Sequence, residues 1–235
     1  MLTMRLYLGI LRDSLKSFGK LFVLHHLTLQ EVRPEGEDIK TFVFKSNKKL
    51  NYRAGQYGIW MQRRWVKGKP WRFFTVASAP EEGVVQLSTR ISKSDFKQKL
   101  NELKPGGKML MLGPIGEFTL PQPAPSEVVF VAGGIGVTPI RAISKYTSDA
   151  SLPIKTTLIH SSRGYYLYKD ELEKYVTKAY FTDRDSFEAI LQQVAEQQPE
   201  AIFYLSGPPN FVESTRKLLL QKNVRHIKTD GFLGY

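Results

Sequence analysis

A glycine-rich segment in the second half of the chain has the residues of a phosphate-binding turn. The apolar run 128–131 leads into residues 133–136, Gly-Gly-Ile-Gly, which Thr138 and Pro139 follow. Threonine is a favoured helix N-cap and proline a favoured first helical residue, so the spacing predicts a helix that Thr138 caps. Glycines allow a sharp turn and let a diphosphate approach the amides at the positive end of a helix. Pro139 replaces the third glycine of the common dinucleotide fingerprint, and a tight turn beside a packed helix is the alternative interpretation.

The segment 71–75, Trp-Arg-Phe-Phe-Thr, offers a second place for a phosphate in the first half of the chain. On a strand, Arg72 and Phe74 share a face, so a guanidinium could hold a phosphate bidentately while a ring covers a flat ligand. Thr75 adds a hydroxyl. Residues 94–97, Ser-Asp-Phe-Lys, add a helix cap and a cation near the start of a helix. Together they predict a second diphosphate site, although aromatic residues in strands more often belong to a core.

Short strands are expected to position the second site. Segments rich in β-branched, aromatic or other apolar residues alternate with turn residues, which favours an antiparallel barrel or sandwich. The strands are expected at 27–29, 41–44, 57–61, 73–76, 84–89 and 109–112, with one helix at 94–103.

Three prolines, Pro121, Pro123 and Pro125, mark a boundary, because prolines favour an extended connector. After them, apolar runs alternate with helical patterns, which indicates a parallel sheet. Strands are expected at 128–131, 155–159 and 202–205, and helices at 140–146, 170–175, 187–197 and 211–221. Residues 1–24 have apolar side chains at helical spacing and basic residues on another face. The predicted organisation is therefore an amphipathic helix at 1–24, a β-barrel domain at 25–121 and an α/β domain at 122–235.

The composition indicates the kind of binding partner and excludes several kinds of catalytic and metal site. The formal net charge is +12, which indicates an anionic partner such as a phosphate-bearing ligand, an acidic protein, a membrane surface or nucleic acid. The basic residues are scattered and form no nucleic-acid-binding motif. The chain has no cysteine, so it cannot hold an iron–sulfur cluster, cysteine-ligated zinc or a cysteine nucleophile. We expect no metal site, and a cytoplasmic location in which the helix at 1–24 packs on the fold or touches the inner face of the membrane.

Three segments resemble motifs of the ferredoxin–NADP reductase family. Residues 72–75 resemble its Arg-x-Tyr-Ser/Thr motif, and residues 133–139 resemble its Gly-Gly-x-Gly-x-Thr-Pro segment. Residues 205–209, Leu-Ser-Gly-Pro-Pro, resemble its Cys-Gly-Pro-Pro segment. The three motifs occur in the family's order and spacing, so the resemblance covers residues 26–235. It implies a two-domain fold: an antiparallel β-barrel FAD-binding domain followed by an α/β domain, with a parallel sheet, that binds a nicotinamide nucleotide.

The resemblance also implies roles for the matching residues. Arg72 would hold the FAD diphosphate, Phe74 would pack on the flavin or its ribityl chain, and Thr75 would hydrogen-bond to flavin N5. The other residues implied for FAD are Phe73, Ser88, Thr89, Arg90, Phe96 and Lys97. Those implied for NADPH or NADH are Gly133, Gly134, Gly136, Thr138, Pro139, Ser162, Arg163, Gly207, Pro208 and Phe211. Arg163 would meet a 2′-phosphate if the nucleotide carries one.

The chain departs from the family pattern at two positions. Phe74 replaces the usual tyrosine and loses a hydrogen bond worth roughly 0.5–1.5 kcal/mol, so FAD binding should survive. Ser206 stands where many members have cysteine near the path of the hydride, which predicts slower transfer. The terminal residues Phe232 and Tyr235 resemble those of reductases whose last aromatic residue stacks on the flavin as a lid, with Tyr235 the preferred candidate. The candidate catalytic residues are therefore Thr75, Ser206 and Tyr235.

The function that this resemblance implies is hydride transfer from NADH or NADPH to FAD, followed by transfer of electrons to a separate acceptor. The basic surface would suit an acidic ferredoxin or flavodoxin, and a quinone or ferric chelate is an alternative acceptor. Two other hypotheses are a redox-sensing subunit without turnover, and a basic protein that binds membrane or nucleic acid.

Overall fold

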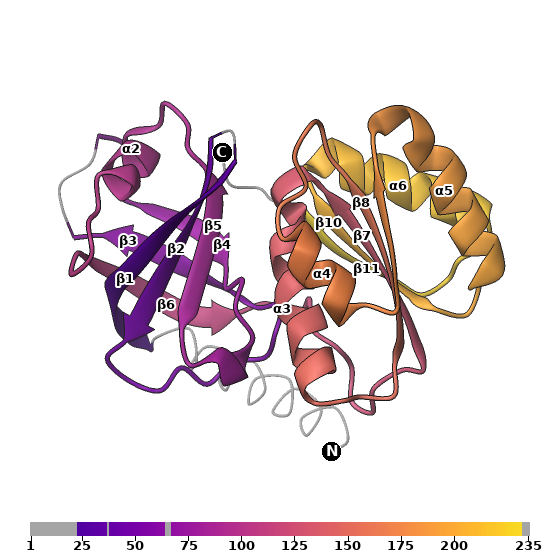
Figure 1. Cartoon of the computed structure of the whole chain (residues 1–235), viewed down its shortest axis with the longest axis horizontal. Coiled ribbons are helices and arrows are strands. Elements are labelled where there is room, and N and C mark those ends of the chain that lie inside the picture. Colours follow the sequence, from indigo (N-terminus) through magenta and orange to yellow (C-terminus); the bar gives the residue numbers. More distant parts are fainter. Residues whose placement is uncertain (1–22, 37, 64–66, 232–235) are drawn as a thin grey trace, which may run out of the picture.

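The protein folds into two sheets that lie side by side with helix α3 between them (Figure 1). The computed structural model describes residues 23–36, 38–63 and 67–231. Residues 1–22, which hold nearly all of the predicted N-terminal helix, lie outside the described residues, as do Phe232 and Tyr235. The end of that prediction is wrong, because Leu24 already belongs to the first strand.

The first sheet is antiparallel and has the order β4-β3-β6-β1-β2-β5. Its strands are β1 (Leu24–Gly36), β2 (Ile39–Ser46), β3 (Tyr57–Gln62), β4 (Trp71–Thr75), β5 (Val85–Arg90) and β6 (Lys108–Ile115). The two outer strands approach each other where the amide of Ala77, just after β4, donates to the carbonyl of Gln86 on β5 at 2.9 Å. The sheet thereby curls into a half-barrel, and the predicted antiparallel barrel class is confirmed.

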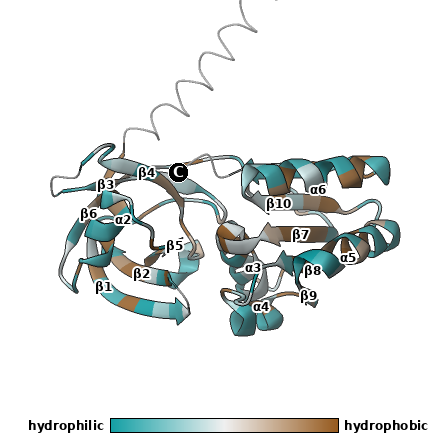
Figure 2. Ribbon diagram, turned by 90° about the horizontal axis from the view of Figure 1, so that it is seen from above, coloured by the Kyte–Doolittle hydropathy of each residue, from teal (hydrophilic) through white to brown (hydrophobic). Residues whose placement is uncertain are grey.

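The interior of the half-barrel follows from the two-residue period of its strands. Leu27 and Leu29 on β1, and Phe42 and Phe44 on β2, point inward and surround the buried Trp60. Figure 2 shows the matching alternation of hydrophobic and hydrophilic residues along β1. Helix α2 (Asp95–Asn101) packs on this core through buried residues, and the short helix η1 (Pro80–Glu82) lies between β4 and β5 in the chain.

The second sheet is parallel, with the order β11-β10-β7-β8-β9. Its strands are β7 (Glu127–Gly133), β8 (Lys155–Ser161), β9 (Lys178–Thr182), β10 (Ile202–Gly207) and β11 (Ile227–Gly231). Its helices are η2 (Gly134–Gly136), α3 (Val137–Asp149), α4 (Lys169–Tyr175), α5 (Arg184–Gln197) and α6 (Pro209–Gln221). The sequence patterns predicted neither β9 nor β11, because these edge strands carry polar residues and are only partly buried.

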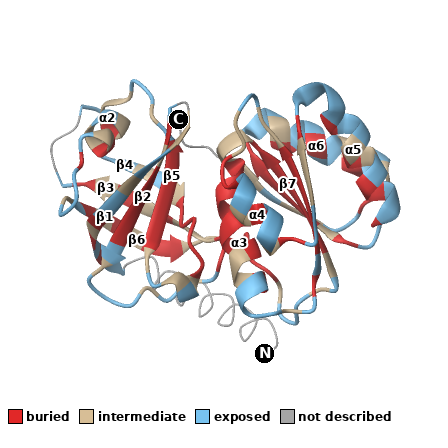
Figure 3. Ribbon diagram, in the orientation of Figure 1, coloured by how far each residue is buried: buried red, intermediate tan, exposed pale blue. Residues whose placement is uncertain are grey.

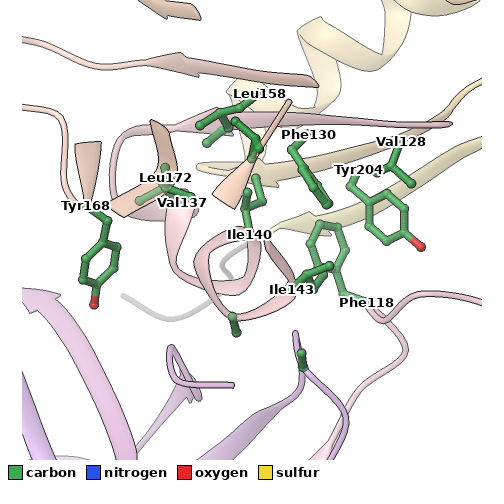
Figure 4. Packing of buried hydrophobic residues seen from close by; sticks show 14 of the residues in the cluster. Phe118, Val128, Phe130, Val137, Ile140, Ile143, Leu158, Tyr168, Leu172 and Tyr204 are labelled. Carbon is green, nitrogen blue, oxygen red and sulfur yellow. The ribbon is translucent and has the colours of Figure 1, made fainter. Parts of the chain in front are cut away.

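Both faces of this sheet are covered, which explains its continuous apolar strands. Val128 and Phe130 pack toward α3, whereas Val129 and Val131 pack toward α5 and α6. Figure 3 shows the resulting buried strand β7 between helices with exposed outer sides. Val137, Ile140 and Ile143 of α3 belong to one buried cluster with Phe130 and Tyr204 of the sheet (Figure 4). Helix α3 thus rests on the sheet while its other side faces the barrel (Figure 1).

The start of α3 differs from the expectation for Thr138. The 3₁₀ turn η2 runs directly into the α-helix, so the helix begins at Val137 with Gly136 as its N-cap. Thr138 therefore lies inside the first turn and does not cap it. Pro139 is tolerated there because the first amides of a helix have no partner within the helix.

Candidate functional site

A cavity of about 1300 Å³ lies between the two sheets. On the α/β side its lining comes from the carboxyl ends of parallel strands, including Gly133, Ser161 and Gly231. The chain runs from β7 outward to β8 and β9 and then returns to place β10 on the other side of β7. Such a reversal opens a crevice outside the strand ends, which is where open α/β sheets bind ligands. The volume exceeds that of a typical single-ligand pocket, so two nucleotide-sized ligands could share it.

The cavity brings together most of the residues singled out from the sequence. Its lining includes Arg72, Phe73, Phe74, Thr75, Ser88, Thr89, Arg90, Lys97, Gly133, Gly134, Thr138, Ser162, Arg163, Pro208 and Phe211. Among the described residues, five other predicted ones lie outside this lining: Phe96, Gly136, Pro139, Ser206 and Gly207. The two halves of the predicted site, one between Arg72 and Lys97 and the other from Gly133 onward, thus face one space.

Arg72 enters the cavity wall from β4. Its Nη1 donates to the carbonyls of Lys69 at 3.0 Å and Trp71 at 2.8 Å, and its guanidinium carbon lies 5.4 Å from the ring centre of Phe96. Phe96 is itself buried beneath Arg72 and Phe74, so it supports the wall without lining it. Among the described residues, no carboxylate forms an ion pair with Arg72. Its charge is therefore available to an anionic ligand.

Lys97 adds a second cation to the same wall. Its pKa is lowered by burial and, next, by the positive charge of Arg72. The negative charge of Asp38 raises the pKa of Lys97 in part, but the Asp38 carboxylate already forms an ion pair with Arg90. Cations held together in a partly buried place repel each other, and a bound diphosphate would relieve that repulsion.

Thr75 presents a hydroxyl that lacks a partner. Its side chain is 5% exposed, and Oγ1 makes no hydrogen bond to any described residue. An unpaired buried hydroxyl costs roughly 1–3 kcal/mol, which a ligand with a matching polar atom would recover. Thr75 pairs across the sheet with Tyr57, a lining residue that the sequence did not single out.

Ser88, by contrast, already has protein partners. Its hydroxyl lies 2.7 Å from that of Thr41 and also bonds to Tyr168, the residue that precedes α4. The Ser88 hydroxyl therefore ties the barrel to the α/β domain. This contact was not foreseen from sequence, and an FAD contact by Ser88 stays a prediction.

The glycine turn is shaped by close backbone packing. A Cβ on Gly136 would lie 2.4 Å from the carbonyl oxygen of Ser206, and one on Gly133 would lie 2.7 Å from the ring of Phe211. Only glycine permits these approaches. Gly134 has a φ of +54° and open space where a side chain would be, so its backbone faces the cavity unobstructed. These features fit a ligand that approaches the main chain.

His160, which sequence reasoning missed, braces this turn from β8. Its Nε2 lies 2.9 Å from the carbonyl oxygen of Gly134 and donates to it. Burial lowers the pKa of His160 to about 4, so the ring is neutral at physiological pH. Nothing in the local sequence distinguishes this histidine, because its partner is 26 residues away.

Asp230, also missed, places a carboxylate in the cavity from β11. Burial raises its pKa to about 6, and no hydrogen-bond partner or ion pair forms with it in the described chain. It pairs with Ser206 on β10, and its charge is the second cause, after burial, of the raised pKa of Tyr57. Sequence reasoning missed Asp230 because it did not recognise β11, the strand on which Asp230 lies.

Ser206 is fully buried behind the lining. Its Oγ makes no hydrogen bond to the described residues, and neighbouring Pro208 reaches the cavity instead. A direct role of Ser206 in hydride transfer therefore stays a prediction.

The far end of the cavity on the α/β side contains further basic and aromatic residues. Arg163 follows β8 and Arg184 begins α5, and neither has a carboxylate partner within the described ranges. Phe187 and Phe211 pack with their ring centres 5.1 Å apart. Arg184 and Phe187 were not singled out from sequence. The arrangement offers an apolar surface for a base and cations for phosphate.

Across the described residues, no group of three or more His, Asp or Glu side chains is arranged to hold a metal ion. No helix in the same ranges has both the length and the apolar character needed to cross a bilayer.

The barrel half matches a known domain family. Residues 26–120 match the model of the oxidoreductase FAD-binding domain. The electron transfer subunit of a probable dihydroorotate dehydrogenase B (NAD(+)) from Methanocaldococcus jannaschii is 28% identical over 159 residues, which are 68% of this chain and 56% of the relative. Ferredoxin–NADP reductase B from Sorangium cellulosum is 29% identical over 150 residues, 62% of this chain and 57% of the relative. The chain thus spans a little more than half the length of these relatives.

Solved structures share the two-domain fold. The ferredoxin reductase in carbazole 1,9a-dioxygenase superposes with a TM-score of 0.76 at 20% identity, over 90% of this chain and 70% of that one. A ferredoxin NADP+ reductase from Neisseria gonorrhoeae, solved with bound FAD and NADP, gives a TM-score of 0.75 at 18% identity, over 89% of this chain and 99% of that one. These matches confirm the predicted fold class and the expected resemblance to ferredoxin–NADP reductase-like proteins.

Proposed function

We propose, from the premise that residues 26–120 are an oxidoreductase FAD-binding domain in a ferredoxin–NADP reductase-like fold, that the chain is an NAD(P)H-dependent flavoprotein reductase. It would take a hydride from NADH or NADPH onto FAD and pass the electrons to a separate acceptor. The observation that carries the proposal is the shared cavity. In it, strand β4 with the guanidinium of Arg72 and the glycine turn of the α/β domain line the same space.

The barrel wall would hold FAD. Arg72 and Lys97 supply positive charge for the diphosphate, Phe74 supplies an apolar ring, and the unpaired hydroxyl of Thr75 supplies a hydrogen bond. The residues present therefore fit the group.

The α/β wall would hold the nicotinamide nucleotide. The backbone at Gly134 is open to the cavity and lies at the start of a helix, where amides favour phosphate. Arg163 and Arg184 would bind phosphate at the adenosine end, and Pro208 would shape the nicotinamide pocket.

When bound, FAD supplies the capacity to accept a hydride and to release electrons one at a time. The chain contributes orientation, charge and the exclusion of water. Hydride transfer itself needs no general base, which agrees with the lack of a cluster of acidic and histidine side chains in the described part of the cavity.

The acceptor would be an acidic protein such as a ferredoxin or flavodoxin. The formal charge of +12 supports electrostatic attraction to such a partner. Phe73 at the cavity wall is 44% exposed and packs against Trp71, which lies outside the lining and is 37% exposed, so an apolar contact surface adjoins the proposed flavin wall. A quinone is the alternative acceptor.

The direct test is anaerobic addition of NADH or NADPH to protein loaded with FAD. The proposal expects flavin absorbance in the purified or reconstituted protein and bleaching by at least one nucleotide. Stable flavin absorbance in the presence of both nucleotides would leave a nucleotide-sensing protein and reject the reductase. A protein that takes up no FAD would reject both. An acceptor screen after bleaching, with ferredoxin, flavodoxin and quinone compared, would then identify the electron acceptor.

A further inference from the structure

Arg141 lies at the boundary between the two domains and outside the cavity lining. Its side chain is only 4% exposed. Nε and Nη2 both donate to the same oxygen of Glu171 on α4, at 3.1 and 2.5 Å. Nη1 donates to the carboxylate of Glu82 in η1 and lies 3.4 Å from the carbonyl oxygen of Ala77. One guanidinium therefore binds two segments of the α/β domain to the barrel.

Ala77, which Arg141 contacts, and Arg141 itself both lie only a few residues along the chain from a wall of the cavity. Ala77 lies two residues after Thr75, the cavity residue with the unpaired hydroxyl. Arg141 itself belongs to α3, the helix that the glycine turn begins. Both anchors belong to hydrogen-bonded backbone, because the Ala77 amide donates to the carbonyl of Gln86 on β5 and Arg141 lies within α3. A shift of the guanidinium relative to Ala77 would thus change the separation of the two walls.

The contacts of Arg141 are rigid. Glu82 is itself fixed, because its carboxylate accepts from the amide of Ala79 at 2.5 Å. The guanidinium carbon also lies 5.6 Å from the ring centre of Tyr168, whose hydroxyl binds Ser88 on the barrel. The planar fork of an arginine restricts orientation in a way that a single ammonium group does not. Because of desolvation, a buried ion pair is often no more stabilising than apolar residues of the same volume would be, although removal of one partner alone is destabilising. The effect that we consider for Arg141 is therefore on geometry, and its test has to separate this effect from a loss of stability.

We propose that Arg141 is a positioning residue that sets the separation of the two cavity walls, and through it the rate at which electrons pass between ligands bound on each wall. The inference rests on the proposed function, since it concerns transfer between a flavin and a nicotinamide. It assigns Arg141 no contact with either ligand. Its loss should therefore slow transfer while leaving the binding of each ligand separately intact.

The experiment compares Arg141→Met, Arg141→Lys and the control Lys145→Met in FAD-loaded full-length protein. Lys145 lies one helical turn further along α3. Its ion pair is with Asp149 of the same helix and its ammonium lies over the Tyr175 ring of α4, so the control removes the same charge without breaking a hydrogen bond to the barrel. Three quantities are measured: flavin content, the Kd of the oxidised nicotinamide nucleotide, and the rate of flavin reduction in anaerobic single turnovers.

For Arg141→Met we expect flavin content and nucleotide Kd within about twofold of wild type, and a flavin reduction rate lower by roughly tenfold or more, because small misplacements of reacting groups cost large factors in rate. Arg141→Lys should recover part of the rate, since a lysine can reach one of the two carboxylates. Lys145→Met should behave as wild type. Amide hydrogen exchange in segments 77–82 and 168–171 should be faster in Arg141→Met than in the control, because the contacts that Arg141 makes across the domain boundary are lost.

An unchanged reduction rate in Arg141→Met would refute the proposal, as would a loss of flavin in proportion to the loss of rate, which indicates a merely structural role. If Arg141→Met does not fold, Glu82→Gln and Arg141→Lys decide by the same criteria. If neither nucleotide reduces wild type, the proposed function fails separately. The positional role of Arg141 is then judged by hydrogen exchange alone, and identical exchange of segments 77–82 and 168–171 in Arg141→Met and the control would refute it.

Discussion

Replacing Asp230 with asparagine should make the FAD-loaded protein more stable above pH 6. Burial raises the pKa of this carboxyl from its usual 3.8 to about 6, so the folded state disfavours its ionised form. Between these two values the folded state binds more protons than the unfolded state, and stability falls as pH rises. The cost is fully present above pH 6. An asparagine carries no charge to bury and nearly the same shape.

The gain in the free energy of unfolding follows from the shift in the pKa of Asp230. A difference of about two pKa units corresponds to roughly 3 kcal/mol at pH 8, as an upper figure. At pH 5 about half of this cost is already relieved by protonation, so the advantage of Asp230→Asn over wild type should grow by about 1.4 kcal/mol between pH 5 and pH 8.

Urea unfolding of wild type and variant at saturating FAD, at both pH values, measures this difference. Asp149→Asn is the matched control, because Asp149 is ion-paired with Lys145 on an exposed helix surface. That substitution should lower stability slightly, by less than about 1 kcal/mol. An Asp230→Asn variant with the same pH dependence as wild type would show that the carboxyl is well solvated or paired, and the electrostatic description of this part of the cavity would be wrong.

Three further substitutions and one deletion test the proposed site and the glycine turn beside it. Arg72→Ala should weaken FAD binding by roughly 10- to 100-fold, the worth of a charge-assisted hydrogen bond, and calorimetry showing an unchanged Kd would remove Arg72 from the FAD site. Thr75→Val should keep FAD but slow flavin reduction by about tenfold, with Thr75→Ser near wild type, and equal rates for all three would argue against the hydroxyl. Gly136→Ala should destabilise the fold by roughly 1–3 kcal/mol in thermal unfolding, since its Cβ would lie 2.4 Å from a backbone oxygen of β10, whereas Gly231→Ala, which meets nothing within 4 Å, should not. Deleting Tyr235 should change the affinity for the nicotinamide nucleotide, and identical titrations would show that the terminus is not a lid.

Much of the fold could be predicted from local patterns. Apolar periodicity and turn residues indicate the strands of the barrel. They also indicate the strand before the glycine turn and the helix after it. Both signals depend only on residues that are neighbours in sequence. Strands β9 and β11 could not be predicted in this way. Both lie at the edges of the sheet, where positions are only partly buried. Strand β11 there accepts lysine, threonine and aspartate, and β9 has an apolar run of only three residues, 179–181, between a lysine and a threonine. The start of α3 also differed, because the 3₁₀ turn brings the backbone into helical geometry before Thr138.

Some residues of the candidate site could likewise be recognised from local sequence, and others could not. Arg72 and the glycine turn could be recognised because motif residues are adjacent and each carries its own chemistry. Asp230, His160 and Arg141 could not, because their importance depends on partners far away in sequence: a desolvating cavity, the Gly134 carbonyl and the Glu82 carboxylate. The sequence by itself indicated the fold class, and it predicted which segments are candidates for binding phosphate. The tertiary structure alone decided which isolated charges share a buried space, because burial and long-range contact arise only when the two sheets pack against α3.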